Sequence, residues 1–133
     1  MKISREIVQN DFIRDIEELS GQNLLACYQC GKCSAGCPMI EHMDILPSLI
    51  IRLLQLGADK EVLDSETIWV CASCLQCMAK CPKGVDLAKI MDALRTYLRR
   101  RGIDKVEITK IADEMWKHLP QQALVSGFRK LSP

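Results

Sequence analysis

The sequence predicts an all-α fold of short helices. Apolar residues recur at three- and four-residue spacing in most of the patterned segments, and no alternating strand pattern extends beyond a few residues. Eight cysteines lie in two runs of identical spacing between these segments. The length of 133 residues suits one compact domain, since single domains usually have about 100 to 150 residues. We therefore expect a single helical domain over residues 1–133, built around the two cysteine runs.

The first predicted helix precedes the first cysteine run, where apolar residues recur at helical spacing between residues 12 and 19. Asn10 or Asp11 can cap its start, because a side-chain oxygen at that position accepts a hydrogen bond from a free backbone N–H. Gly21 can end it, since glycine readily takes the left-handed conformation that closes a helix.

A second predicted helix lies between the two runs, with its apolar residues between Ile45 and Leu56. Pro47 suits its first turn, because a backbone N–H there would have no helical partner. Gly57 is expected to stop it, and a short helix is expected to follow over residues 60–64.

Two further helices are predicted after the second run. Asp86 begins the first of them, whose apolar side continues to residue 98 and which ends near Gly102. The second is expected over residues 104–119, ending before Pro120. The remaining tail, residues 121–133, has a weak pattern and is expected to be disordered or to contact a partner.

Both cysteine runs read C-x-x-C-x-x-C-x-x-x-C-P. They consist of Cys27, Cys30, Cys33, Cys37 and Pro38, and of Cys71, Cys74, Cys77, Cys81 and Pro82. This spacing is typical of proteins with two 4Fe-4S clusters, in which three cysteines of one run bind a cubane and the fourth binds the other cluster. Eight thiolates complete two cubanes and leave no iron open to a substrate, so the pattern indicates electron relay rather than catalysis.

We predict that each cluster takes its fourth cysteine from the distant run. A tight turn can wrap three thiolates around one cubane, whose fourth iron then faces away from that turn. The predicted ligands are Cys27, Cys30, Cys33 and Cys81 for the first cluster, and Cys71, Cys74, Cys77 and Cys37 for the second. The first run contains Gly31 and Gly36, whereas the second has no glycine between its cysteines, so a more regular backbone is expected there.

Two structural zinc ions are the alternative, since eight thiolates also fill two four-cysteine sites. Zinc motifs, however, usually present C-x-x-C pairs that are joined by a longer loop. Three cysteines at the same short spacing therefore favour cubanes.

The cysteines and the N-terminal segment together predict a cytoplasmic protein. Residues 1–10 lack the continuous apolar stretch of a secretory signal, and cytosolic thiols stay reduced and able to bind metal. The most apolar stretch, from Ile45 to Leu56, is shorter than the roughly 20 residues of a membrane span. With 18 basic and 17 acidic side chains, no overall charge favours nucleic acid.

The segment from Cys27 to Pro38, CYQCGKCSAGCP, resembles the C subunits of heterodisulfide reductases, as does the segment from Ile68 to Cys77, IWVCASCLQC. The resemblance covers a cluster core of about residues 20–101, which is followed by a C-terminal helix and tail over residues 103–133. It implies an α-helical ferredoxin in which two cubane clusters lie between short helices.

The same resemblance implies a hetero-oligomer. In it, this chain passes electrons from a flavin-containing, iron-sulfur A subunit to a catalytic B subunit that reduces a disulfide. The chain is then a non-catalytic part of an oxidoreductase. The substrate of the complex stays open between the coenzyme M–coenzyme B disulfide and another sulfur compound. A free diffusible two-cluster ferredoxin and a cluster-stabilised structural adaptor are the alternatives.

Two further groups of residues lie near the runs. The methionines are expected to fill the core around the clusters, and most of the arginines to suit the negative dipole end of a helix, with a docking patch as the alternative. These residues are Met39, Met43, Met78 and Met91, and Arg95, Arg99, Arg100 and Arg101.

Overall fold

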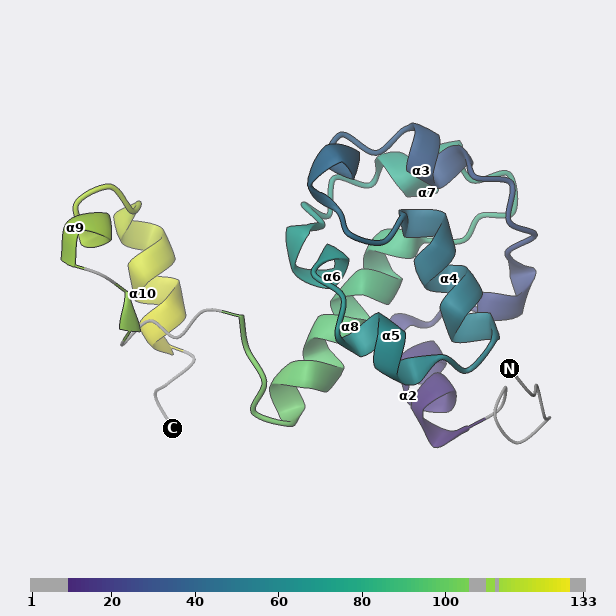
Figure 1. Cartoon of the computed structure of the whole chain (residues 1–133), viewed down its shortest axis with the longest axis horizontal. Helices are drawn as coiled ribbons and strands as arrows, with labels where there is room; N and C mark the ends of the chain where they lie inside the picture. Colours follow the sequence, from purple (N-terminus) through teal and green to yellow (C-terminus); the bar gives the residue numbers. More distant parts are fainter. Residues whose placement is uncertain (1–9, 106–109, 112, 130–133) are drawn as a thin grey trace. The chain divides into compact units, whose positions relative to one another are not determined.

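The computed structural model describes residues 10–105, 110–111 and 113–129 (Figure 1). The described residues form helices and turns without a β-strand, which confirms the all-α prediction. The chain divides into two compact units, Met1–Gly102 and Ile103–Pro133. The prediction that residues 1–133 form a single domain stays a prediction.

Both cysteine runs lie in the first unit, between its short helices. In chain order the described helices of this unit are α2 (Asp11–Ser20), η1 (Leu24–Ala26), α3 (Lys32–Ala35), η2 (Ile40–His42), α4 (Pro47–Gln55), α5 (Asp59–Leu63), α6 (Thr67–Val70), α7 (Gln76–Lys80) and α8 (Leu87–Arg100). Helices α3 and α7 come from different runs and pack against each other (Figure 1). Helix α2 packs on α8, and α4 packs on α3 and α5. The packing of α3 on α7 brings the two runs together.

The ends of α2 confirm the signals in the sequence. The Asn10 side chain accepts a hydrogen bond from the Ile13 N–H at 2.9 Å, and Gly21 closes the helix with φ of 62°. Helix α4 begins with Pro47 in its first turn, and Gly57 just beyond its end has φ of 69°.

Helix α8 also begins and ends close to its predicted limits. Asp86 caps it, because its carboxylate accepts the Lys89 N–H at 3.2 Å. The Asp86 N–H donates in turn to the side chain of Gln22 at 2.8 Å, which ties this helix start to the loop after α2. None of the helices in the described part of the chain is long and apolar enough to cross a membrane.

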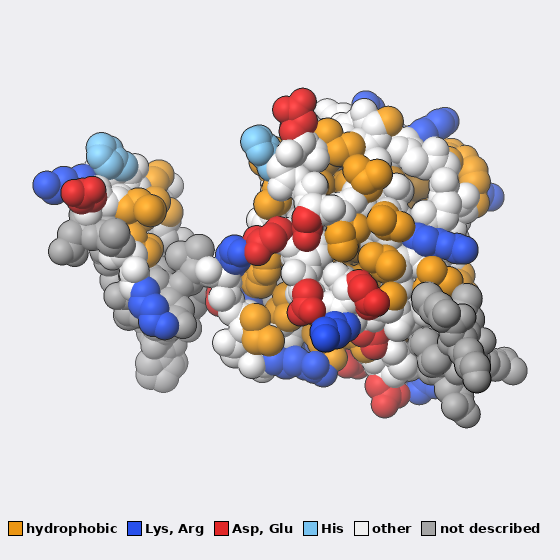
Figure 2. All heavy atoms as spheres, viewed as in Figure 1, with side chains coloured by type: hydrophobic (Ala, Val, Ile, Leu, Met, Phe, Trp, Pro, Cys, Tyr) orange, Lys and Arg blue, Asp and Glu red, His pale blue; other side chains and the backbone are white. Residues whose placement is uncertain are grey.

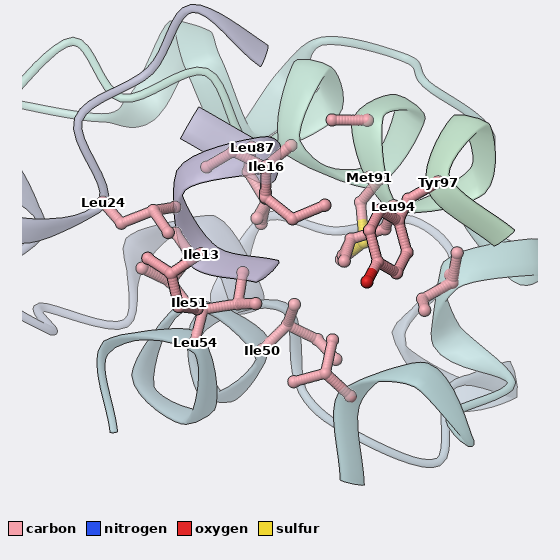
Figure 3. Close-up of a cluster of buried hydrophobic side chains, with 14 of the residues drawn as sticks. Ile13, Ile16, Leu24, Ile50, Ile51, Leu54, Leu87, Met91, Leu94 and Tyr97 are labelled. Carbon is pink, nitrogen blue, oxygen red and sulfur yellow. The ribbon is translucent and has the colours of Figure 1, made fainter. Parts of the chain in front are cut away.

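A hydrophobic core joins α2, α4 and α8. Ile16, Ile50, Leu54 and Leu94 point toward one another from these helices and are fully buried (Figure 3). Five of the cysteines pack against the same core: Cys27, Cys33, Cys71, Cys77 and Cys81. The core therefore supports the inner side of both runs.

The second unit differs from the sequence prediction. A continuous helix over residues 104–119 was wrong: residues 104 and 105 are not helical, and the only α-helix described in that range is α9 (Asp113–Trp116). Part of the range, residues 106–109 and 112, lies outside the described residues.

The tail is also more regular than expected, since α10 (Gln121–Arg129) follows Pro120. The Pro120 carbonyl accepts the Ala123 N–H at 2.9 Å, so this proline lies at the start of a helix, whereas α9 already ends at Trp116. The physical reason is that helical periodicity alone does not place helix ends. Short helices gain most of their stability from tertiary packing.

Candidate iron-sulfur site

The two cysteine runs follow the same backbone path. Gln29 and Ser73 lie two residues after the first cysteine of each run, and their φ angles are 63° and 52°. Two residues further on, Gly31 and Leu75 have φ of 76° and 63°. The expected regular backbone of the second run was therefore wrong. Leu75 takes a left-handed conformation because the turn between the cysteines requires it. For a residue with a side chain this conformation costs about 1–2 kcal/mol.

The first cavity gathers four cysteines from both runs. It encloses about 350 Å³ of atom-free space, part of which opens to solvent, and its walls include Lys32, Ile51 and Val85. The cysteines that line it are Cys27, Cys30, Cys33 and Cys81. These four are the predicted ligands of the first cluster.

The second cavity gathers the other four. It encloses about 390 Å³ of atom-free space, part of which again opens to solvent. It is lined by Cys71, Cys74, Cys77 and Cys37, together with Cys33 from the neighbouring set. Leu87, at the start of α8, lines both cavities and is 3% exposed. This leucine and Cys33 therefore border both spaces.

All eight cysteines are free thiols, and their exposure repeats between the runs. Cys30 and Cys74, the second cysteine of each run, are exposed, and the other six are half-buried. Burial raises the pKa of Cys33 and of Cys77, the third cysteines, whereas the backbone N–H of Lys32 and then the Tyr28 hydroxyl lower the pKa of Cys30. These two half-buried thiols thus release their protons less readily, and the free energy of metal binding drives their deprotonation.

Two of the cysteine sulfurs at the first cavity accept hydrogen bonds. The Val85 N–H donates to the Cys81 Sγ at 3.3 Å, and the Gln29 Nε2 donates to the Cys27 Sγ at 3.5 Å. Such bonds to ligand sulfurs are among the features that tune the potential of an iron-sulfur cluster.

Asp44 links the end of the first run to the beginning of the second. Its carboxylate accepts hydrogen bonds from the Ser65 hydroxyl at 2.9 Å, from the Glu66 N–H at 3.0 Å, and from the N–H and hydroxyl of Thr67 at 2.8 and 2.7 Å. Desolvation opposes the charge, but the hydrogen bonds from Thr67, Glu66 and Ser65 outweigh it and hold the pKa of Asp44 well below its usual range. The carboxylate therefore fixes the start of α6, which leads into Cys71.

Sequence reasoning missed two side chains that hold the runs. Gln55 donates from its Nε2 to the carbonyls of Leu24 and Cys27, and Arg95 donates to the carbonyls of Ile68 and Cys71. The interpretation of Arg95 as a cation at the helix end was wrong, because its guanidinium faces the second run. One sequence signal pointed to this: Arg95 lies at helical spacing from the buried Met91 and Leu98.

The methionine prediction is confirmed in part. Met39, Met43 and Met91 line the second cavity, where their flexible side chains fill an irregular apolar wall. Met78 does not fill the core, since 47% of its surface is exposed on α7.

Nowhere in the described part of the chain do three or more Cys, His, Asp or Glu side chains gather closely enough to hold a single metal ion.

Two cysteine-lined cavities in an all-helical unit define a two-cluster iron-sulfur protein. Residues 23–85 match the family model described as a 4Fe-4S dicluster domain. The eight free thiols equal in number the ligands that two such clusters need, and they line two neighbouring cavities. The cofactors are therefore two 4Fe-4S clusters, as the sequence predicted, and not two zinc ions.

The chain is similar to the C subunits of heterodisulfide reductases. The iron-sulfur C subunit of the CoB–CoM heterodisulfide reductase of Methanopyrus kandleri is 33% identical over 108 residues, which covers 75% of this chain and 56% of the relative. The corresponding C 2 protein of Methanocaldococcus jannaschii is 32% identical over 108 residues, covering 75% and 58%. The C subunit of the ferredoxin:CoB–CoM heterodisulfide reductase of Methanosarcina acetivorans is 37% identical over 93 residues, covering 70% and 37%. The chain thus spans at most about three fifths of the length of these relatives.

Proposed function

We propose that this chain is an electron-transfer subunit of a heterodisulfide-reductase-like complex in the cytoplasm. It relays electrons from a flavin-containing, iron-sulfur A subunit to a catalytic B subunit that reduces a disulfide. The observation that carries the proposal is the pair of neighbouring cavities, in each of which the first three cysteines of one run meet the fourth cysteine of the other, while Cys33 borders both. The similarity to C subunits of heterodisulfide reductases supports the complex.

The ligand sets of the proposal follow the cavities. Cys27, Cys30, Cys33 and Cys81 hold the first cluster, and Cys71, Cys74, Cys77 and Cys37 hold the second. A 4Fe-4S cluster with four thiolate ligands gains and loses single electrons. Leu87 lines both cavities and is 3% exposed, which supports two clusters that lie side by side with an apolar wall in common.

Exposed apolar side chains near the runs support a partner surface. Hydrophobic side chains spread over the face of the first unit that Figure 2 shows, among acidic and basic groups. Within the runs and the helices beside them, Leu25, Tyr28, Leu75 and Met78 are between 47% and 65% exposed. Apolar groups next to the exposed cysteines suit docking of a donor or acceptor protein, since they become buried and exclude water on contact.

Four cysteine variants test the ligand sets. We expect Cys27→Ser and Cys81→Ser to disturb the same cluster, and Cys74→Ser and Cys37→Ser to disturb the other. The measurement is the electron paramagnetic resonance spectrum of the reduced protein with its iron content, which is about eight irons for two intact clusters. If each run instead held its own cluster, the spectrum of Cys81→Ser would match that of Cys74→Ser, and the crossed assignment would be wrong.

The relay itself is tested with the partner proteins. A flavoprotein that co-purifies with the chain should reduce both clusters, and addition of the disulfide-reducing partner with its substrate should reoxidise them. Clusters that stay oxidised at every potential the donor reaches would favour a structural adaptor. Electron transfer by the isolated chain to many acceptors, without a stable partner, would favour a free ferredoxin.

A further inference from the structure

The first cysteine run is held by a neutral side chain from α4. The Nε2 of Gln55 donates to the Leu24 carbonyl at 2.8 Å and to the Cys27 carbonyl at 2.9 Å. Leu24 lies three residues before Cys27, so one amide group joins the turn before the run to the first cysteine. Gln55 is half-buried, which limits competition from water for these bonds.

The second run is held in the same way by a charged side chain from α8. The Nε of Arg95 donates to the Ile68 carbonyl at 2.7 Å, and its terminal nitrogen donates to the Cys71 carbonyl. Ile68 lies three residues before Cys71, so these two carbonyls correspond to those that Gln55 holds. A third bond at 3.3 Å joins the guanidinium to the Ser73 hydroxyl. Each run thus has an equivalent brace, neutral in one case and cationic in the other.

The charge of Arg95 is less screened than the other positive charges near the cavities. Arg95 is half-buried against the second run, whereas Lys32 at the first cavity is exposed. Arg99, over the Trp69 ring at 5.8 Å, is also exposed. Water and salt weaken the field of exposed charges far more than that of partly buried ones.

We propose that Arg95 is a positioning residue for the second cluster and that its charge raises the reduction potential of that cluster, while Gln55 gives the first run the same support without charge. This inference rests on the proposed ligand sets. Each one-electron reduction adds a negative charge inside the ring of four thiolates, and a fixed cation beside the Cys71 carbonyl stabilises the reduced form. The brace therefore makes two nearly identical runs electrically different.

Arg95→Gln gives the second run the neutral brace of the first. We expect the ratio of reduced to oxidised second cluster to fall about tenfold at a given potential, which for one electron corresponds to about 59 mV. The first cluster should keep its potential. The measurement is a redox titration of the whole chain with dithionite and mediators, followed by electron paramagnetic resonance, with the cysteine variants identifying each signal.

Two further variants separate charge from support. Arg95→Lys keeps the positive charge but loses the planar fork of the guanidinium. We therefore expect the ratio of reduced to oxidised second cluster at a given potential to change less than about threefold, while the protein loses iron faster than the unsubstituted chain. Gln55→Lys adds a charge to the first brace, and it should raise the potential of the first cluster alone. This variant carries the test if Arg95→Gln does not fold.

The inference is overturned if Arg95→Gln moves both potentials equally or neither of them, or if Gln55→Lys leaves the first cluster unchanged. Either result, with about eight irons and two cubane signals still present, would leave the relay function standing. Absence of cubane signals from the unsubstituted chain would instead contradict the proposed function.

Discussion

The Asp44→Ala substitution tests whether one carboxylate joins the two halves of the site. Asp44 lies in the loop before α4, and its hydrogen-bond donors lie at the start of α6, more than twenty residues away. Two of the donor residues are buried, with Ser65 3% exposed and Thr67 fully buried. Removing the carboxylate leaves these groups with fewer partners at the point where the chain turns into Cys71.

The magnitude follows from the bonds that are lost. A helix cap contributes about 0.5–2 kcal/mol, and hydrogen bonds to a charged acceptor contribute about 1.5–3 kcal/mol. Asp44 itself is exposed, so water replaces part of this interaction. Thr67 also keeps the Ile45 carbonyl as a partner at 2.7 Å. We expect Asp44→Ala to lower the free energy of unfolding by about 2 kcal/mol, or the melting temperature of a unit of this size by about 8–16 °C.

The pH dependence has a definite sign. The folded-state pKa of Asp44 is lowered, so its contribution is fully present above the pKa of the unfolded chain, about 3.9, and is lost as pH falls through the folded value. The difference in stability between the unsubstituted chain and Asp44→Ala should therefore stay constant from about pH 8 to 5 and narrow only below about pH 4.

Thermal denaturation at one heating rate, followed by far-ultraviolet circular dichroism and by cluster absorbance, measures both effects. Asp92→Ala is the control, because Asp92 is exposed on α8 and its loss should change stability by less than about 0.5 kcal/mol. Equal melting temperatures for Asp44→Ala and Asp92→Ala, or a difference that already narrows between about pH 7 and 6, would refute the reasoning.

Substitutions at two other positions have clear expected outcomes. Leu94 is fully buried in the core, so Leu94→Ala should lower the free energy of unfolding by about 2–5 kcal/mol, whereas Leu94→Met should lower it by less than about 1.5 kcal/mol. Chemical denaturation measures both losses, and equal losses would contradict the close packing of Leu94 in the core. Gly31 has φ of 76° with no atom within 4 Å of an added Cβ, so Gly31→Ala should cost only the left-handed strain of about 1–2 kcal/mol. Gly31→Asn should cost less than Gly31→Ala in the same measurement, because asparagine tolerates this conformation, and the reverse order would be inconsistent with strain as the cause.

Local signals in the sequence predicted most of the first unit. Asn10, Gly21, Pro47 and Asp86 act within a turn of their own positions, so their meaning does not depend on the rest of the chain. The same signals were insufficient for Pro120, which was expected to end one helix and in fact precedes another. Apolar periodicity alone does not decide where so short a helix begins, because short helices gain most of their stability from tertiary packing.

For the site, too, the sequence predicted some features correctly and misled at others. Cysteine number and spacing by themselves favoured two 4Fe-4S clusters over two zinc ions, because the distance between ligands along the chain limits which metal group three thiolates can surround. Residue type misled at Leu75, where leucine takes the conformation that glycine has in the other run. A turn that is imposed by its surroundings overrides the preference of a single residue.

The sequence by itself determined the helical class, the helices beside the runs and the kind of cofactor, since all of these depend on residues close together in the chain. Only the tertiary structure decided that α3 packs on α7, that Asp44 holds α6, and that Gln55 and Arg95 brace equivalent carbonyls. Those contacts join segments more than twenty residues apart, or helices from different runs. Their partners are selected by the packing of the whole unit, and no short pattern in the sequence records that packing.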